Sequence, residues 1–277
     1  SLAIHLDREA NNGRALNAQK ELPLLLHDFQ SNEKNDFRQT LLTQLLHEHP
    51  ACDAEAILDF EICACDTQPA AVIGLKNEYI AGARLDNLLS CFAGLRALLD
   101  SDGLQPTLLV CTDHEEVGSV SACGAQGQFL NSVLQRWLGN SETRARTLHR
   151  SMLISADNAH GIHPNHPEKH DEKHAPHLNS GPAMKVNANQ RYASNTTTQA
   201  FFRHLCEQQK IPVQMFVARA DMGCGSTITA AEIGIQTIDI GVPTFAMHSI
   251  RELAGVKDIS YLYNALCAFF NCAHLPD

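Results

Sequence analysis

Residues 107–119 have the sequence Thr-Leu-Leu-Val-Cys-Thr-Asp-His-Glu-Glu-Val-Gly-Ser. The apolar run Leu108–Cys111 predicts a strand that is buried on both faces, as in a parallel sheet covered by helices. Four ionisable residues follow at once, Asp113–Glu116, and Gly118 then allows a sharp turn. Ionisable groups at the end of a buried strand are costly unless a cation or a reaction uses them. A solvated acidic loop is the simpler alternative, and this stretch alone does not choose between the two.

The two adjacent glutamates suit a divided role. Neighbouring side chains of an extended segment point to opposite sides, so Glu115 and Glu116 can face different partners. One of them could ligate a metal ion while the other holds a water molecule. In open α/β sheets, ligands bind beyond the carboxyl ends of the strands, where this pair is expected to lie.

The composition is that of an ordinary globular protein. The chain has 277 residues, 44% hydrophobic and 19% charged, which is enough for one large core or two domains. Lys and Arg number 21 against 31 Asp and Glu, and the resulting charge of −10 disfavours nucleic acid and anionic membranes as partners. No apolar run approaches the roughly 18 residues of a membrane-spanning helix.

The ten cysteines include no CxxC pair, and most lie in apolar surroundings. Buried free thiols are typical of a reducing compartment, so we expect a cytoplasmic protein without a disulfide framework. The start of the sequence, Ser1–His5, has no initiator Met and no signal-like segment, and we expect the chain to be part of something longer.

Alternating helical and strand patterns from residue 84 onward predict an α/β fold with a mostly parallel, doubly wound sheet flanked by helices. Strands are expected at 107–112, 151–155, 213–217 and 236–240, and helices after Asp86 and at 128–138, 196–209 and 258–271. Upstream, a helix containing residues 41–46 should end at Pro50, with a strand at 56–65 and a strand pair at 70–74 and 79–80. This part of the chain is expected to be rich in β-structure.

Five ionisable residues are each expected at a strand end or a helix start along one edge of the sheet: Asp86, Glu115, Glu116, Asp157 and His248. For Asp86, capping the following helix is the simpler role. Crowded carboxylates raise one another's pKa unless cations neutralise them. Oxygen ligands with one imidazole suit zinc, manganese or cobalt, and two such ions about 3.5–4 Å apart are suited to amide hydrolysis.

Four segments together carry a family resemblance: Arg84-Leu-Asp-Asn87, Asp113-His-Glu-Glu-Val-Gly-Ser119, Ser155-Ala-Asp-Asn-Ala-His160 and Ala246-Met-His-Ser-Ile-Arg-Glu252. In this order, over nearly the whole chain, they resemble the M18 family of metallo-aminopeptidases, the aspartyl aminopeptidase group. The resemblance implies an enzyme that removes the N-terminal residue of a peptide substrate with two zinc ions. The group's name suggests an acidic N-terminal residue.

The resemblance also implies roles, carried over by position. Asp86 would bridge the two metal ions, Glu115 would be the general base, and Glu116, Asp157 and His248 would be further ligands. Lys185 and Tyr192 match positions that approach the substrate, although Lys185 could be a surface residue and Tyr192 a core residue. Neighbours that would support the ligands are Asp113, His160 and His163.

Residues 1–67 resemble the second half of a dimerisation domain, and residues 68–277 the catalytic domain, so the resemblance implies dimers assembled into a dodecamer. The family's upstream HTDSP-type motif, whose histidine completes one zinc site, does not occur here, and a Gly-Pro-Ile is lacking after Ile228. We therefore expect this chain by itself to be weakly active.

Two alternatives remain open. The same scaffold could carry a related di-zinc deacylase or amidase. Alternatively, the six histidines within residues 160–177 could make a non-catalytic metal-binding or assembly protein, although loop packing and subunit contacts are the simpler explanation for them.

Overall fold

The computed structural model describes residues 3–26, 36–217 and 232–276, and the chain divides into two compact units, Ser1–Ala64 and Cys65–Asp277. The glycine-rich segment 221–226 and the residues after Ile228 lie outside the described part. Within that part, no helix is both long enough and apolar enough to cross a membrane.

The first unit contains α1 (Ala18–Glu21) and α2 (Phe37–Glu48), which confirms the predicted helix before Pro50. The predicted strand at 56–65 is wrong, because this segment contains no strand. Its carbonyl groups are bound by a side chain instead, since the Arg38 guanidinium donates to the carbonyl of Ile57 at 2.9 Å. Phe60 packs edge-on against Phe37, with ring centroids 5.3 Å apart.

Within the described residues, the second unit is built on a seven-stranded mixed sheet. Its strands are β1 (Ala71–Ile73), β2 (Tyr79–Gly82), β3 (Met152–His160), β4 (Ala183–Val186), β5 (Gln214–Val217), β6 (Gln236–Phe245) and β7 (Glu252–Gly255). The order is β1-β2-β7-β6-β4-β5, with β3 paired to β6. The longest ladder, β3 with β6, is parallel, as is β4 with β5, and the other pairings are antiparallel. The predicted α/β class is confirmed, with antiparallel strands added to the parallel ladders.

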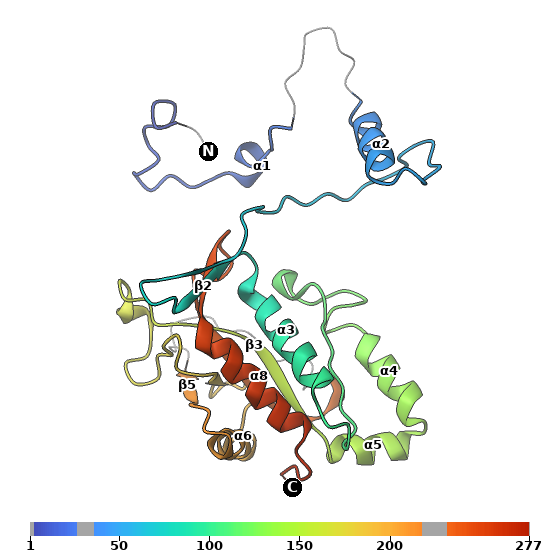
Figure 1. Ribbon diagram of the computed structural model, residues 1–277, viewed down its shortest axis with the longest axis vertical. Coiled ribbons are helices and arrows are strands. Elements are labelled where there is room, and N and C mark those ends of the chain that lie inside the picture. Colours follow the sequence, from blue (N-terminus) through green and yellow to red (C-terminus); the bar gives the residue numbers. More distant parts are fainter. Residues whose placement is uncertain (1–2, 27–35, 218–231, 277) are drawn as a thin grey trace. The chain divides into compact units, whose positions relative to one another are not determined.

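Within the described residues, the helices of the second unit are α3 (Leu85–Leu99), α4 (Phe129–Leu138), α5 (Ser141–His149), α6 (Thr196–Gln208) and α8 (Val256–Phe270), with short 3-10 turns η1 (Glu115–Val117) and η2 (Pro167–Lys169). Helices α3, α6 and α8 pack on the sheet as the apolar patterns predicted, whereas α4 and α5 pack against each other. Helix α5 was not predicted. Helices α3 and α8 lie side by side, and together with α6 and β6 they enclose the main core, which includes Phe202, Ile240 and Leu262 (Figure 1).

The predicted strand at 107–112 is wrong. The segment has no strand assignment, and the side chain of Leu108 is 42% exposed. Within the described ranges no strand pairs with it, and a strand without a neighbour leaves its backbone groups to solvent. It packs on α3 instead: a Cβ on Gly94 would lie 2.9 Å from Cδ1 of Leu109.

Leu262 tests the core packing. Its side chain is 1% exposed, and replacing it with alanine should lower the free energy of unfolding by about 2–5 kcal/mol because a cavity would remain. The matched control is Leu99→Ala on α3, where the side chain is 66% exposed and the expected change is within about 0.5 kcal/mol. Urea denaturation measures both, and equal effects would contradict this description of the core.

Candidate metal centre

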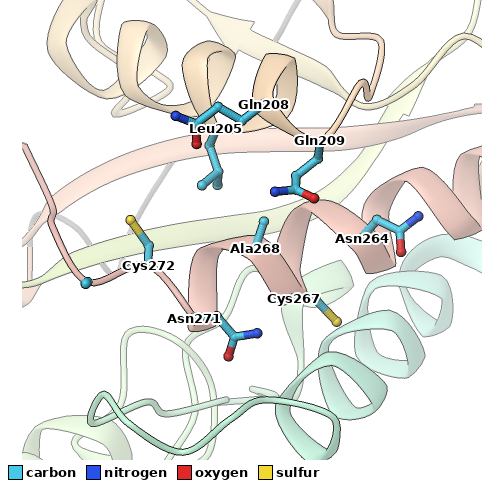
Figure 2. A pocket seen from close by; sticks show the side chains of 9 residues that line it. Leu205, Gln208, Gln209, Asn264, Cys267, Ala268, Asn271 and Cys272 are labelled. Atoms are coloured by element: carbon cyan, nitrogen blue, oxygen red, sulfur yellow. The ribbon is translucent and has the colours of Figure 1, made fainter.

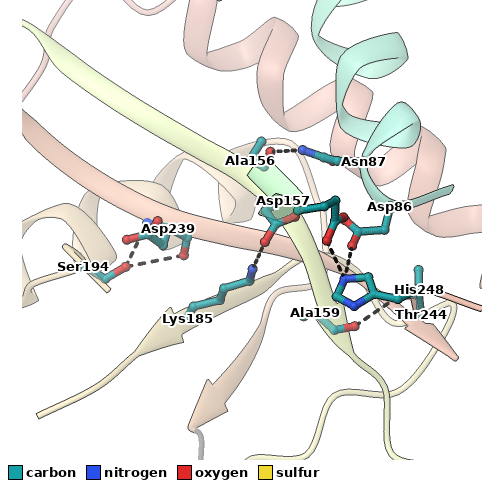
Figure 3. A network of polar contacts seen from close by, with 11 residues as sticks. Asp86, Asn87, Ala156, Asp157, Ala159, Lys185, Ser194, Asp239, Thr244 and His248 are labelled. Carbon is teal, nitrogen blue, oxygen red and sulfur yellow. Dashed lines mark hydrogen bonds and ion pairs between the residues drawn. The ribbon is translucent and has the colours of Figure 1, made fainter. Parts of the chain in front are cut away.

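Three potential ligands from distant parts of the chain meet beside the sheet. The Nε2 atom of His248 lies 3.1 Å from Oδ2 of Asp86 and 3.1 Å from Oε2 of Glu116. All three ligand atoms lie within 4.8 Å of one another. The side chain of Asp86 is 4% exposed, whereas those of Glu116 and His248 are open to solvent. The group therefore combines one buried carboxylate with two ligands that solvent can reach. Figure 3 shows His248 beside Asp86.

The local backbone structure positions the ligand side chains. Asp86 and Asn87 have non-helical backbone conformations at the start of α3. The Asp86 side chain does not cap the helix, because its Oδ1 has no hydrogen-bond partner and its Oδ2 lies 3.1 Å from Nε2 of His248. Asn87 ties the same turn to β3 by donating from Nδ2 to the carbonyl of Ala156 at 3.0 Å. Glu116 lies in η1, directly after the segment that packs on α3.

A residue that the sequence analysis did not single out holds two of the ligands. Glu252, 2% exposed at the start of β7, accepts a hydrogen bond from the backbone N–H of Asp86 at 2.7 Å with one carboxylate oxygen. Its other oxygen accepts from the backbone N–H of His248 at 2.8 Å. The sequence feature that could have revealed this role is the position of Glu252 in the Ala246–Glu252 motif. A glutamate that is buried there must accept hydrogen bonds from nearby donors.

Asp157 adjoins the group from β3, where it lies within the strand and not beyond its end, opposite Gly241 in the register with β6. Its Oδ2 accepts from Nζ of Lys185 at 2.8 Å (Figure 3). Lys185 is buried in β4 and reaches Asp157 past Gly241, where a Cβ would lie 2.8 Å from the lysine Cε. The Lys185 ammonium also lies 5.6 Å from the ring centroid of Tyr192.

The carboxylates strongly influence one another's pKa. Burial raises the pKa of Asp86 to about 8, and the nearby charges of Asp157 and Glu116 add to this effect. Burial, with the charges of Asp157 and Glu116, also raises the pKa of Glu115. Burial acts on Asp157 in the same direction, but the ammonium of Lys185 outweighs it, so the pKa of Asp157 is lowered. The buried Oδ1 atom of Asp86 has no hydrogen-bond donor.

This arrangement fits a divalent cation. An unpaired buried carboxylate oxygen beside two further carboxylates is unfavourable unless a proton or a cation lies between them. Oxygen donors with a single imidazole suit zinc, and also manganese or cobalt. Asp86, Glu116 and His248 are the residues placed to hold such an ion, with Asp157 next to Asp86.

The other predicted site residues are distributed around this group. Burial and the charge of Lys185 lower the pKa of His160, which places this histidine near the centre. His163 lies against Phe245, with ring centroids 5.3 Å apart, and makes no described contact with the carboxylates. Asp113 belongs to a separate group with His114 and Cys123. Tyr192 is buried, with its ring 6.5 Å from that of Phe216.

Two other regions do not resemble a site. Among the described residues, no metal-ligand group of three includes a histidine of the loop 160–177. An open pocket of about 610 Å³ between α6 and the end of α8 is lined by amide, thiol and apolar side chains, without a charged residue (Figure 2). Neither contains the convergence of ionisable groups that the Asp86 centre has.

Comparison with known proteins finds relatives over almost the whole chain. Residues 1–270 match the family described as Aminopeptidase I zinc metalloprotease (M18). A probable M18 family aminopeptidase 2 of Pseudomonas syringae pv. syringae (strain B728a) is 58% identical over 279 residues, which cover 100% of this chain and 65% of that protein. The chain thus spans slightly less than two thirds of the length of this relative.

Solved structures share the fold. A chain in the cryo-EM structure of the Ape4 and Nbr1 complex has 34% identity and a TM-score of 0.84, over 98% of this chain and 57% of that chain. The S. cerevesiae mApe1 dodecamer has 28% identity and a TM-score of 0.64, over 74% of this chain and 49% of that chain. From its family match and the identity of its relatives, the chain belongs to the M18 family of zinc metallopeptidases.

Proposed function

We propose that this chain carries the metal centre and general base of an aminopeptidase that removes the N-terminal residue of peptides. The observation that supports this most directly is the meeting of Asp86, Glu116 and His248 within 4.8 Å, beside Asp157. The Pseudomonas syringae relative is named as a probable M18 family aminopeptidase. A bound zinc ion would supply Lewis acidity toward the scissile carbonyl and acidify a water molecule.

The chain's own residues would handle the proton. Glu115 precedes Glu116 in η1, and burial, with the charges of Asp157 and Glu116, raises its pKa. A carboxylate with a raised pKa is a stronger base, suited to take a proton from the attacking water and return it to the leaving amine. Tyr192 is proposed to lie near the substrate, where its hydroxyl could stabilise the developing oxyanion.

We propose that two metal ions are bound, with Asp86 between them, because Glu116 and His248 lie beside Asp86 and Asp157 adjoins it. His160 and His163 are proposed to support the ligands, whereas Asp113 groups with His114 and Cys123. One ion would have only Asp86 and Asp157 from this chain, since no HTDSP-type motif occurs in the sequence. We therefore propose low activity for the 277-residue chain by itself.

We also propose a homo-oligomeric assembly and a cytoplasmic location. Residues 1–67 are proposed to belong to a dimerisation domain and 68–277 to the catalytic domain of a homo-oligomer. This proposal is supported by the similarity to mApe1, whose solved structure is a dodecamer. The nine free cysteines of the described part support a cytoplasmic setting. A di-zinc deacylase remains the second candidate, and a panel of aminoacyl and N-acyl amide substrates separates the two.

Glu115→Gln tests the base. The amide keeps the size of the side chain but cannot accept the proton, so turnover should fall by about 10²–10⁴-fold while the bound metal per chain stays constant. Glu142→Gln, the same change on the exposed face of α5, should leave turnover unchanged. Steady-state kinetics and metal analysis report both quantities, and unchanged turnover in Glu115→Gln would remove the assignment.

The raised pKa of Asp86 predicts a pH dependence of stability in the metal-free protein. Between about pH 4 and pH 8 the folded state keeps a proton that the unfolded state releases, since the ordinary pKa is 3.8 and the folded value is about 8. Stability should therefore fall as pH rises through this window and level off above it. Asp86→Asn should remove this component, and adding zinc should reverse the loss in the unaltered chain. Denaturation in a chelator at several pH values measures it, and a stability difference between the two chains that does not change with pH would contradict the assignment.

A substitution at Lys185 distinguishes two possible roles of this residue, pairing with Asp157 and recognition of an acidic substrate side chain. Its ammonium is paired with Asp157, so we expect Lys185→Met to lower kcat/KM by about 10–100-fold to the same extent for substrates with acidic and with neutral N-terminal residues. A loss confined to acidic substrates would instead assign Lys185 to the recognition of an acidic substrate side chain. Lys257→Met, at an exposed lysine in the first turn of α8, is the matched control.

A further inference from the structure

A second group of metal-ligating side chains lies outside the Asp86 centre. It comprises Asp113, His114 and Cys123, whose ligand atoms lie within 4.8 Å of one another and whose side chains are exposed. The Nδ1 atom of His114 is 3.7 Å from Sγ of Cys123. Zinc bonds of about 2.0–2.3 Å in a tetrahedron place neighbouring ligand atoms about 3.5 Å apart, so these two donors are already at a suitable spacing.

The backbone holds the three residues together without a metal ion. The N–H of Asp113 donates to the carbonyl of Cys123 at 3.1 Å, which joins the two ends of the loop. Inside it, the N–H of Ser119 donates to the carbonyl of His114 at 2.8 Å. Gly124 lies so close to Ser119 that a Cβ would be 2.2 Å from the serine carbonyl oxygen. A loop closed in this way loses little conformational freedom when its side chains take up a ligand.

A polar neighbour also orients the imidazole. The hydroxyl of Ser121 lies 2.8 Å from Nδ1 of His114 and 3.8 Å from Sγ of Cys123. The imidazole therefore already lies beside the thiol, and the serine hydroxyl is next to both. A cation bound by Nδ1 of His114 and Sγ of Cys123 would replace the hydrogen bond between Nδ1 and Ser121, and would leave Ser121 or a water molecule at the open position.

We propose that Asp113, His114 and Cys123 form a separate site for a thiophilic divalent cation of the zinc type. One sulfur, one imidazole nitrogen and one carboxylate oxygen are zinc ligands in proteins, and a coordinated thiol loses its proton. A thiolate and a carboxylate together balance the charge of a divalent ion. The Asp86 centre differs because its donors are oxygen and nitrogen only. The inference does not depend on the proposed peptidase activity.

A cation bound at this site would also restrain the backbone that carries Glu115 and Glu116. Asp113 and His114 directly precede η1, which carries Glu115 and Glu116. An ion bound to Cys123 and to this pair would fix the start of η1 against the loop that follows it. The site would therefore act on the positions of the glutamates without contacting a substrate.

Cobalt distinguishes the two sites, because only a thiolate ligand gives a sulfur-to-cobalt charge-transfer absorption in the near ultraviolet. We expect titration of the full chain with Co²⁺ to produce this band, and Cys123→Ser to abolish it and lower the bound metal by one ion per chain. His114→Ala should weaken cobalt binding by about tenfold or more. Asp86→Asn should leave the band intact, because Asp86 belongs to the other centre.

Cys111→Ser is the matched control, since Cys111 is also an exposed free thiol close in sequence to the same turn. Its band should equal that of the unaltered chain. A second readout covers the case in which a variant folds poorly: in the unaltered chain, zinc should slow alkylation of Cys123 by iodoacetamide but not that of Cys63. Absence of the band, its persistence in Cys123→Ser, or equal alkylation with and without zinc would overturn the site.

Discussion

The buried carboxylate of Glu252 fixes the backbone of two residues of the metal centre. Its two carboxylate oxygens accept backbone N–H groups from Asp86 at 2.7 Å and His248 at 2.8 Å, two residues separated by most of the second unit. Charge-assisted hydrogen bonds of this kind are stronger than neutral ones and set a direction as well as a distance. Because β7 pairs with both β2 and β6, this one side chain ties the start of α3 and the loop after β6 to the middle of the sheet.

Charge sets the second constraint. Three carboxylates and one imidazole face a small space, and the Lys185 ammonium offsets part of the negative charge from the buried side. This compensation reaches Asp157, whose pKa falls despite its burial, but leaves Asp86 with a pKa of about 8 and an oxygen without a donor. The asymmetry gives the two aspartates different properties although both end in the same functional group. A cation bound on the solvent-exposed side would neutralise the negative charge that Lys185 leaves uncompensated.

Much of the fold was predictable because local patterns agreed with the tertiary structure. The apolar periodicity around Leu262 and Phe202 marked helices that pack as expected, and the runs at 151–155 and 236–240 marked the parallel pair β3 and β6. The predictions that failed were the strands at 56–65 and 107–112. A strand requires a partner for its backbone, and composition cannot show whether one is present.

For the site, sequence alone determined which residues carry carboxylates and imidazoles. It also indicated that several of these residues follow strands or begin helices. Residue type and order suffice for that, because ligand preference is a property of the functional group. Only the tertiary structure decided that Asp86, Glu116 and His248 meet, that Lys185 binds Asp157, and that Glu252 holds two of the ligands. These contacts join residues up to 166 positions apart, and the pairing of strands, which no local pattern specifies, creates that proximity.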